Sequence, residues 1–157
     1  MDKKNWKTYI GWILLCELVG IVSAIVTREG MQIYETMVEK PALTPPGWVF
    51  GVVWTILFAL MGISSARISL RDGQGSRRAL NIFAVQLVVN FFWPLFFFNA
   101  MAYGFSFVWL LILWALVVWM ILRFYRLDKT AALLQLPYLA WLSFAAYLNF
   151  SVVLLNR

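Results

Sequence analysis

Three residues with hydrogen-bonding side chains recur at helical spacing inside an apolar stretch of the sequence. Gln86, Asn90 and Trp93 would share one face of a helix. In a membrane-spanning helix such amides turn toward neighbouring helices, because an unsatisfied polar group in hydrocarbon is costly. Hydrogen bonds between helices would account for the amides, but not for the large aromatic side chains beside them. The pattern therefore indicates a cavity inside a helical bundle.

A stretch near the C-terminus repeats this combination of aromatic, small and amide residues. Trp141 and Ala145 share a stripe of the expected helix, and Asn149 lies at its edge. Trp54, Trp93 and Trp141 also fall deeper in their segments than an aromatic belt at the membrane surface would place them. Aromatic walls with a few amides are typical of a site for a flat apolar ligand.

The residue types that most catalytic and metal sites need are missing from this sequence. Histidine is absent and Cys16 is the only cysteine, which excludes a Cys/His zinc site, an axial histidine for haem and an intrachain disulfide. Neither paired carboxylates nor a phosphate-binding loop is visible. We therefore expect no catalytic residues, no metal site and no cofactor.

Glu17 is the only acidic residue well inside an apolar segment. An ionisable side chain in a membrane span is a candidate for proton coupling in a transporter. The alternative is a hydrogen-bonded structural carboxyl that faces the bundle, since no basic residue occurs at that depth.

The composition requires the bilayer as solvent. Hydrophobic residues make up 63% of the 157 residues, charged residues make up 13%, and the mean hydropathy is +0.80. A soluble domain has roughly 25% charged residues, and one of this size could not hide so much apolar surface. The basic residues are scattered among apolar runs rather than clustered on one face, so nucleic acid is not an expected partner.

Five apolar runs are long enough to span a membrane as helices. They cover residues 9–26, 48–66, 80–98, 105–125 and 131–155. The runs are continuous rather than alternating, which argues against strands. The sequence therefore predicts an all-α integral membrane protein, a bundle of five transmembrane helices that forms one domain over residues 1–157.

The distribution of lysine and arginine predicts the orientation of the bundle. Ten of these residues fall in the N-terminal segment and in the second and fourth connections, and three fall on the opposite side. By the positive-inside rule the N-terminus faces the cytoplasm and the C-terminus faces outward. We expect a bacterial cytoplasmic membrane.

The first connection, residues 27–47, is the longest. It ends in Lys40-Pro41-Ala42-Leu43-Thr44-Pro45-Pro46-Gly47, and proline fixes φ and removes backbone donors. The end of the connection should therefore be stiff and extended. The start of a helix and a lid over a pocket at one end of the bundle explain it equally well.

Three motifs along the chain carry a family resemblance. The first motif is Lys40-Pro41 followed by Thr44-Pro45-Pro46-Gly47-Trp48-Val49-Phe50 and Val53-Trp54. The second is Gln86-Leu87 with Asn90 and Trp93. The third is Pro137-Tyr138 with Trp141, Phe144-Ala145 and Leu148-Asn149. With these motifs the sequence resembles the TspO/translocator protein family, also described as tryptophan-rich sensory proteins and as peripheral benzodiazepine receptor-like proteins. The resemblance covers nearly the whole chain.

The resemblance implies a five-helix fold, frequently dimeric, with a pocket under the first loop for porphyrins, sterol-like lipids and drug-like ligands. The family's pocket positions correspond to Pro45, Trp54, Asn90, Trp93, Trp141, Ala145 and Asn149. By this analogy the first loop is a lid. The sterol-recognition pattern of animal members requires a basic residue soon after a tyrosine, and after Tyr147 the first is Arg157, so a tetrapyrrole is the expected ligand.

The leading hypothesis is a membrane sensor or translocator that binds a protoporphyrin IX-like tetrapyrrole. The macrocycle would stack against Trp54, Trp93 and Trp141, and Asn90 and Asn149 would orient its polar edge. One alternative is an enzyme that breaks down porphyrin with light or oxygen, using a pocket tryptophan as redox partner. Another is a proton-coupled small-molecule porter that relies on Glu17. The other expected partners are the lipid bilayer and a second copy of the chain in a homodimer.

Overall fold

The computed structural model describes residues 5–157, so Lys3 and Lys4, which contributed to the orientation argument, lie outside the described residues. All regular structure in residues 5–157 is helical. The elements are α1 (Trp6–Val26), α2 (Arg28–Met37), α3 (Gly47–Ser69), α4 (Gln74–Pro94), a π-helical turn η1 (Leu95–Asn99), α5 (Tyr103–Leu127), α6 (Lys129–Leu133) and α7 (Leu136–Leu155). Five helical segments are long and apolar enough to cross a membrane, which confirms the predicted fold class.

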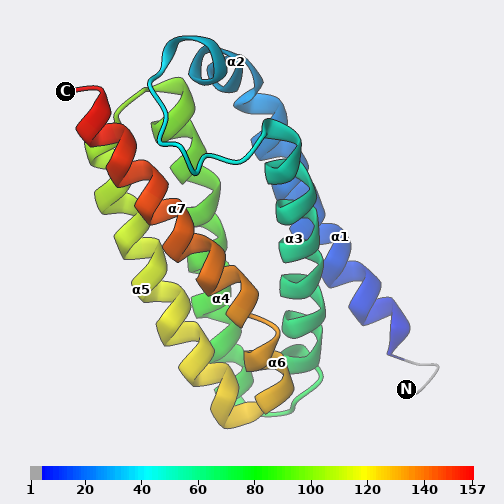
Figure 1. Cartoon of the computed structure of the whole chain (residues 1–157). Coiled ribbons are helices and arrows are strands. Elements are labelled where there is room, and N and C mark those ends of the chain that lie inside the picture. The colour runs from blue at the N-terminus through cyan, green and yellow to red at the C-terminus, as the bar shows by residue number, and fades with distance from the viewer. Residues whose placement is uncertain (1–4) are drawn as a thin grey trace.

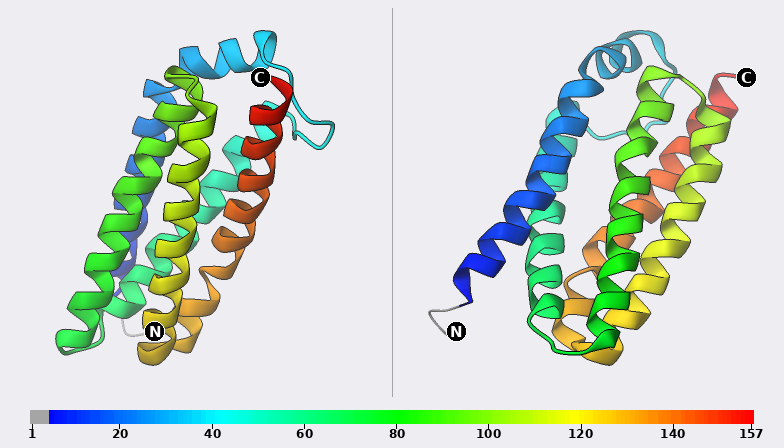
Figure 2. Two further views of the ribbon diagram at one scale, coloured as in Figure 1. Left: turned by 90° about the vertical axis from the view of Figure 1, so that its left-hand side faces the viewer. Right: turned by 180° about the vertical axis from the view of Figure 1, so that it is seen from behind.

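The five long helices run side by side, and the start of α1 and the end of α7 lie at opposite ends of the bundle (Figures 1 and 2). The central helices are α3, α4, α5 and α7, whose buried side chains form the core. In contrast, α1 lies at the periphery against α3, and Cys16 is its only buried residue. Most of the α1 surface therefore faces the surrounding hydrocarbon.

Small residues on α1 and α3 allow these two helices to pack closely. A β-carbon on Gly62 would lie 2.5 Å from the Cα of Ile13, and one on Gly20 would lie 2.5 Å from the Phe58 ring. Gly20 and Gly62 therefore serve helix contacts within one chain. Gly51 differs, because a β-carbon there would meet nothing within 4 Å.

The first connection is more ordered than a loop, because residues 28–37 form α2 across one end of the bundle (Figure 1). Its buried residues, Gly30 and Tyr34, are four positions apart and so share the face that lies on the bundle. The Tyr34 ring contacts those of Phe97 and Phe98, each with centroids 5.3 Å away. The later part of the connection is not helical. Contrary to the prediction from its prolines, it is not extended throughout, because Thr44 N–H donates to the Pro41 carbonyl at 3.0 Å and closes a turn.

Proline residues shape two of the membrane-spanning segments. Pro94 lies inside the third membrane-spanning segment, where α4 changes to η1. There Ala100 N–H donates to the Leu95 carbonyl at 3.0 Å. Pro137 lies in the first turn of α7, a position that tolerates its missing N–H. The fifth expected span is accordingly divided into α6 and α7.

The end of the bundle opposite α2 is held by a buried carboxylate between α5 and α6. Asp128 caps α6 by accepting the Ala131 N–H at 2.9 Å, and it pairs with Arg67 at 2.9 Å and Arg71 at 2.8 Å. Burial opposes ionisation of Asp128, but hydrogen bonds from Arg71, Ala131 N–H and Arg67 lower its pKa to about 2. These contacts fix α3 to the turn between α5 and α6.

Candidate ligand-binding site

Two adjoining cavities lie between the helices and the first connection. The deep chamber, with a volume of about 230 Å³, is walled by α1, α3, α4 and α7 and includes Trp54, Phe58, Asn90 and Trp141. The lid chamber, with a volume of about 560 Å³, lies under the first connection and includes Tyr34, Lys40, Pro45 and Asn149. Five residues line both chambers: Met31, Phe50, Trp93, Phe98 and Ala145. The chambers are therefore contiguous and separated only by side chains.

All seven residues predicted for the site line one or both of these chambers. Trp54, Asn90 and Trp141 line the deep chamber; Pro45 and Asn149 line the lid chamber; Trp93 and Ala145 line both. The fold thus brings together positions from the first connection and from α3, α4 and α7. Their role in binding a ligand stays a prediction.

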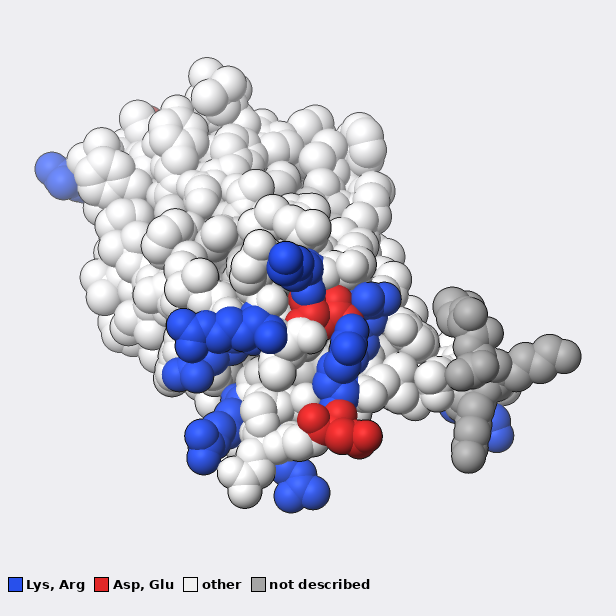
Figure 3. Space-filling view, turned by 90° about the horizontal axis from the view of Figure 1, so that it is seen from below, with Lys and Arg blue, Asp and Glu red and all other residues white. Residues whose placement is uncertain are grey.

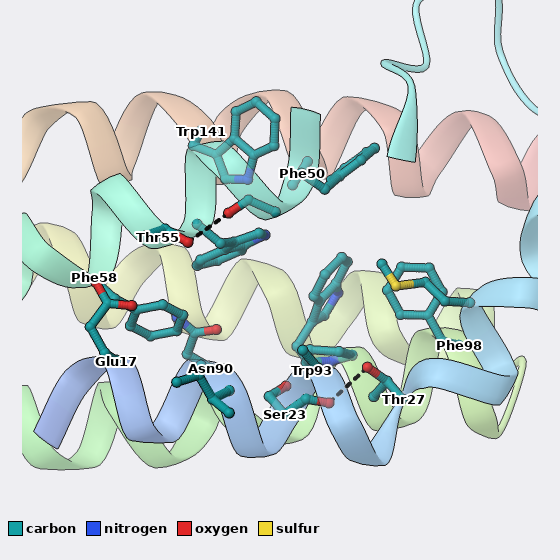
Figure 4. Close-up of a pocket in the computed structure, with 18 residues that line it drawn as sticks. Glu17, Ser23, Thr27, Phe50, Thr55, Phe58, Asn90, Trp93, Phe98 and Trp141 are labelled. Carbon is teal, nitrogen blue, oxygen red and sulfur yellow. Dashed lines mark hydrogen bonds between the residues drawn. The ribbon is translucent and has the colours of Figure 1, made fainter. Parts of the chain in front are cut away.

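Aromatic rings form much of the wall of the deep chamber. Figure 4 shows Phe50 and Trp141 on one side, with Asn90 and Trp93 of α4 across from them. Phe50 and Trp141 meet edge to face with centroids 5.7 Å apart, and Trp93 stacks on Phe97 at 5.2 Å. Such rings present flat faces and edges that a planar apolar ligand can contact.

A hydrogen-bonded chain fixes Asn90 at the chamber wall. The Asn90 amide donates to the Tyr138 hydroxyl at 2.8 Å, and this hydroxyl donates to Gln86 Oε1 at 2.9 Å. All three side chains are buried. Gln86 and Asn90, the two amides of α4 that were predicted to face the bundle interior, are therefore both held by Tyr138 of α7.

The indole N–H of Trp93 has no such partner. Its Nε1 is buried and meets no hydrogen-bond acceptor among residues 5–157. An unsatisfied buried donor costs about 1–3 kcal/mol, and this one belongs to a residue that lines both chambers. A ligand with a suitably placed acceptor would recover that cost.

Asn149 lines the lid chamber, but its amide is engaged elsewhere. Its Nδ2 donates to the Tyr103 carbonyl and to Ser106 Oγ, both at 3.2 Å, and its Oδ1 accepts from Ser106 at 3.3 Å. These bonds join α7 to α5. The predicted role of Asn149 in orienting the polar edge of a ligand would require some of them to break.

The structure adds wall residues that sequence reasoning missed, notably Met31, Tyr34, Phe50 and Phe98. The spacing of Gly30 and Tyr34 was a usable signal for α2 and its inward face. Phe98 had no such signal, because its direction depends on the π-helical turn after Pro94. No cluster of metal-ligating side chains occurs among residues 5–157.

Glu17 also lies at the deep chamber, beside Phe58 (Figure 4). It forms no ion pair with any described residue. This placement is compatible with both interpretations of Glu17, the structural carboxyl and the proton-coupling group.

The fold and the chambers together define a class of protein. It is a membrane protein whose bundle of five spanning helices encloses an aromatic cavity beneath an ordered connection. Comparison with known proteins identifies the family within this class. The model of the TspO/MBR family matches residues 12–155, and the chain belongs to this family.

Three relatives illustrate the breadth of the similarity. The chain is 38% identical to the tryptophan-rich protein TspO of Chlorobaculum tepidum over 147 residues, covering 90% of this chain and 91% of the relative. It is 35% identical to the translocator protein of Bos taurus over 149 residues, covering 92% and 88%. It is 30% identical to the tryptophan-rich sensory protein of Cereibacter sphaeroides over 152 residues, covering 97% and 93%.

Proposed function

We propose that this protein is a membrane sensor or translocator that binds a porphyrin-type tetrapyrrole across the deep chamber and the lid chamber. The observation that carries the proposal is the contiguity of two apolar chambers with aromatic walls and one free indole donor. Two relatives are named as a translocator protein and a sensory protein. These names support the binding of a small molecule but do not indicate which one.

The size of the chambers supports a ligand that occupies both. Sites for drug-sized molecules usually have volumes of about 300–1,000 Å³. The deep chamber, at about 230 Å³, falls below this range, whereas the lid chamber, at about 560 Å³, lies within it. A macrocycle would therefore enter the lid chamber and place one edge in the deep chamber, between Trp93 and Trp141.

A titration of detergent-purified protein with protoporphyrin IX, followed by quenching of tryptophan fluorescence, tests the proposal. The decisive variant is Ala145→Phe, because Ala145 lines both chambers and a ring there would occupy the space between them. We expect saturable binding by the wild type and at least tenfold weaker binding by this variant.

The matched control is Ala115→Phe, since Ala115 is exposed on α5 and lines neither chamber. The control should bind as the wild type does, and both variants should keep the wild-type unfolding temperature in detergent. Quenching that does not saturate, or that is the same in all three proteins, would mean partitioning into detergent and would refute the proposal.

We also infer that the end of the bundle opposite α2 faces the cytoplasm. Lys and Arg side chains gather on this end (Figure 3), as the positive-inside rule requires of a cytoplasmic face. The chambers would then open toward the outer side. Labelling of single cysteines introduced at exposed Arg77 and Leu43 in a Cys16→Ser background, in intact and permeabilised cells, would test this orientation.

A proton-coupled porter is the second candidate, because Glu17 lines the deep chamber. Proteoliposomes with a pH gradient distinguish the two functions. Accumulation of porphyrin that follows the gradient and is lost in Glu17→Gln would favour the porter. Porphyrin binding without flux driven by the pH gradient would instead favour the sensor. The homodimer also stays a prediction, and the molar mass of the detergent-solubilised protein would test it.

A further inference from the structure

The mouth of the lid chamber holds a single cationic group. Among residues 5–157, Lys40 is the only lysine or arginine that lines either chamber. The acidic lining residues are Glu35 in the lid chamber and Glu17 in the deep chamber. The chambers are otherwise apolar or neutral, so the end under the first connection is where a charged group of a ligand would be recognised.

The ammonium group of Lys40 is positioned but not neutralised. Its Nζ donates to the backbone carbonyl of Glu35 at 2.6 Å and lies 5.6 Å from the centroid of the Tyr34 ring. Burial raises the pKa of Tyr34, so this ring is a neutral phenol. An ammonium has three donors, and the carbonyl uses one of them.

The carboxylate of Glu35, although close in sequence, does not pair with Lys40. No described acidic side chain forms an ion pair with this lysine. Glu35 Oε1 instead points at Gly47, where a β-carbon would collide with it. Gly47 is the first residue of α3, and the positive end of the helix dipole stabilises a carboxylate at this position. The charge of Lys40 is therefore left for another partner.

We propose that Lys40 binds a carboxylate of the ligand, so that the ligand class is a flat apolar molecule with an acidic edge held at the mouth of the lid chamber. This inference rests on the proposed function and makes it more specific. The apolar body lies among the aromatic side chains, and the acidic edge accepts the free donors of Lys40. A neutral macrocycle of the same shape lacks this contact.

The discriminating pair of ligands is protoporphyrin IX, which carries two carboxylates, and its dimethyl ester, which carries none. We expect the wild type to bind the acid about fivefold more tightly than the ester, as one partly exposed charged pair allows. Lys40→Gln should lower affinity for the acid to that for the ester and leave the ester unchanged. High salt should reduce the preference of the wild type.

Lys129→Gln is the matched control. Lys129 lies over the Tyr125 ring at 5.6 Å, the same distance as for Lys40 and Tyr34, but it lines neither chamber. This variant should keep the wild-type preference for the acid.

The outcomes separate this inference from the proposed function. Equal affinities for acid and ester, with binding still weakened by Ala145→Phe, would overturn the role of Lys40 alone. So would a Lys40→Gln variant that loses affinity for both ligands equally, which would indicate packing of the lid. Unsaturable quenching by both ligands would overturn the proposed function and this inference together.

Discussion

Asn156, next to the last residue of the chain, forms a reciprocal pair of hydrogen bonds with the backbone of Glu39. Glu39 N–H donates to Asn156 Oδ1 at 3.1 Å, and Asn156 Nδ2 donates to the Glu39 carbonyl at 2.9 Å. The part of the first connection that follows α2 is thus attached to the end of α7. Where the connection begins, Asn99 Nδ2 donates to the Val26 carbonyl at 3.0 Å, so α2 is held on both sides.

Replacing Asn156 by alanine should loosen the lid without unfolding the bundle. Each hydrogen bond contributes about 1 kcal/mol, and both are exposed, so we expect porphyrin to dissociate about fivefold faster. Stopped-flow dissociation measures this rate, and hydrogen exchange of residues 38–46 should accelerate with it. Ser151→Ala is the control on the same helix, because the Ser151 hydroxyl bonds only to its own helix, at the Tyr147 carbonyl. Unchanged dissociation in Asn156→Ala would contradict the anchoring role.

Trp93→Phe should weaken binding and leave the empty protein as stable as the wild type. The variant keeps an aromatic ring but removes an indole donor that has no partner among residues 5–157. We expect about fivefold weaker porphyrin binding by calorimetry.

Trp109→Phe should have the opposite effects on stability and on affinity. Its Nε1 donates to the Val89 carbonyl at 2.8 Å, so the change should lower the free energy of unfolding by about 1 kcal/mol and leave affinity unaltered. Equal effects of the two variants on affinity would rule out a ligand acceptor at Trp93.

Gly62→Ala should destabilise the contact between α1 and α3. The new methyl group would lie 2.5 Å from the Ile13 backbone, and backbone cannot yield as a flexible side chain can. Overpacking of this kind costs about 1–3 kcal/mol, measurable by SDS-induced unfolding in mixed micelles. Gly11→Ala, on α1 with nothing within 4 Å of its β-carbon, should be neutral or slightly stabilising. A Gly62→Ala variant as stable as the wild type would contradict the described packing of α1 against α3.

The ion pairs of Asp128 should make stability depend on pH in the acidic range. Its pKa is about 2 in the folded protein against a reference value of 3.8. The unfolded chain therefore takes up a proton first as pH falls. The contribution, about 2 kcal/mol, is complete above pH 4 and is lost as the pH falls toward 2.

Asp128→Asn separates the charge from the cap. Asparagine can still accept the Ala131 N–H at the start of α6, so the variant should lose stability at pH 7 and show a flatter pH profile between 4 and 2. Unfolding by denaturant across this range measures both effects. If the free energy of unfolding of Asp128→Asn falls as steeply between pH 4 and pH 2 as that of the wild type, other carboxyl groups cause the pH dependence.

The five spans could be predicted because each is a continuous apolar run, and lipid leaves the backbone no alternative to helix. The wall residues of α3, α4 and α7 were predictable for a related reason: helical spacing brings Trp93 and Asn90 to one face, and the depth of Trp54 and Trp141 excludes the membrane surface. The family motifs then identified which of these faces lie together.

Features that depend on contacts between distant segments could not be predicted. The mixed composition of residues 28–37 suggested a loop, but packing of Tyr34 on Phe97 and Phe98 favours a helix there. The π-helical turn arises where Pro94 interrupts the normal bonding, and the spacing of the phenylalanines does not reveal it. The amide of Asn149 resembled that of Asn90 in sequence, and only the positions of Tyr103 and Ser106 on the neighbouring helix commit it to α5.

Because α1 lies at the periphery of the bundle, the reactivity of its cysteine should report movement of this helix. Cys16 is the only cysteine in the sequence, the only buried residue of α1 and 0% exposed. A maleimide should leave this thiol unmodified while α1 rests on the bundle and should alkylate it once the helix moves away. Because α1 also walls the deep chamber, the rate of alkylation with and without porphyrin would measure how often that wall opens, in unmodified protein and without an attached probe.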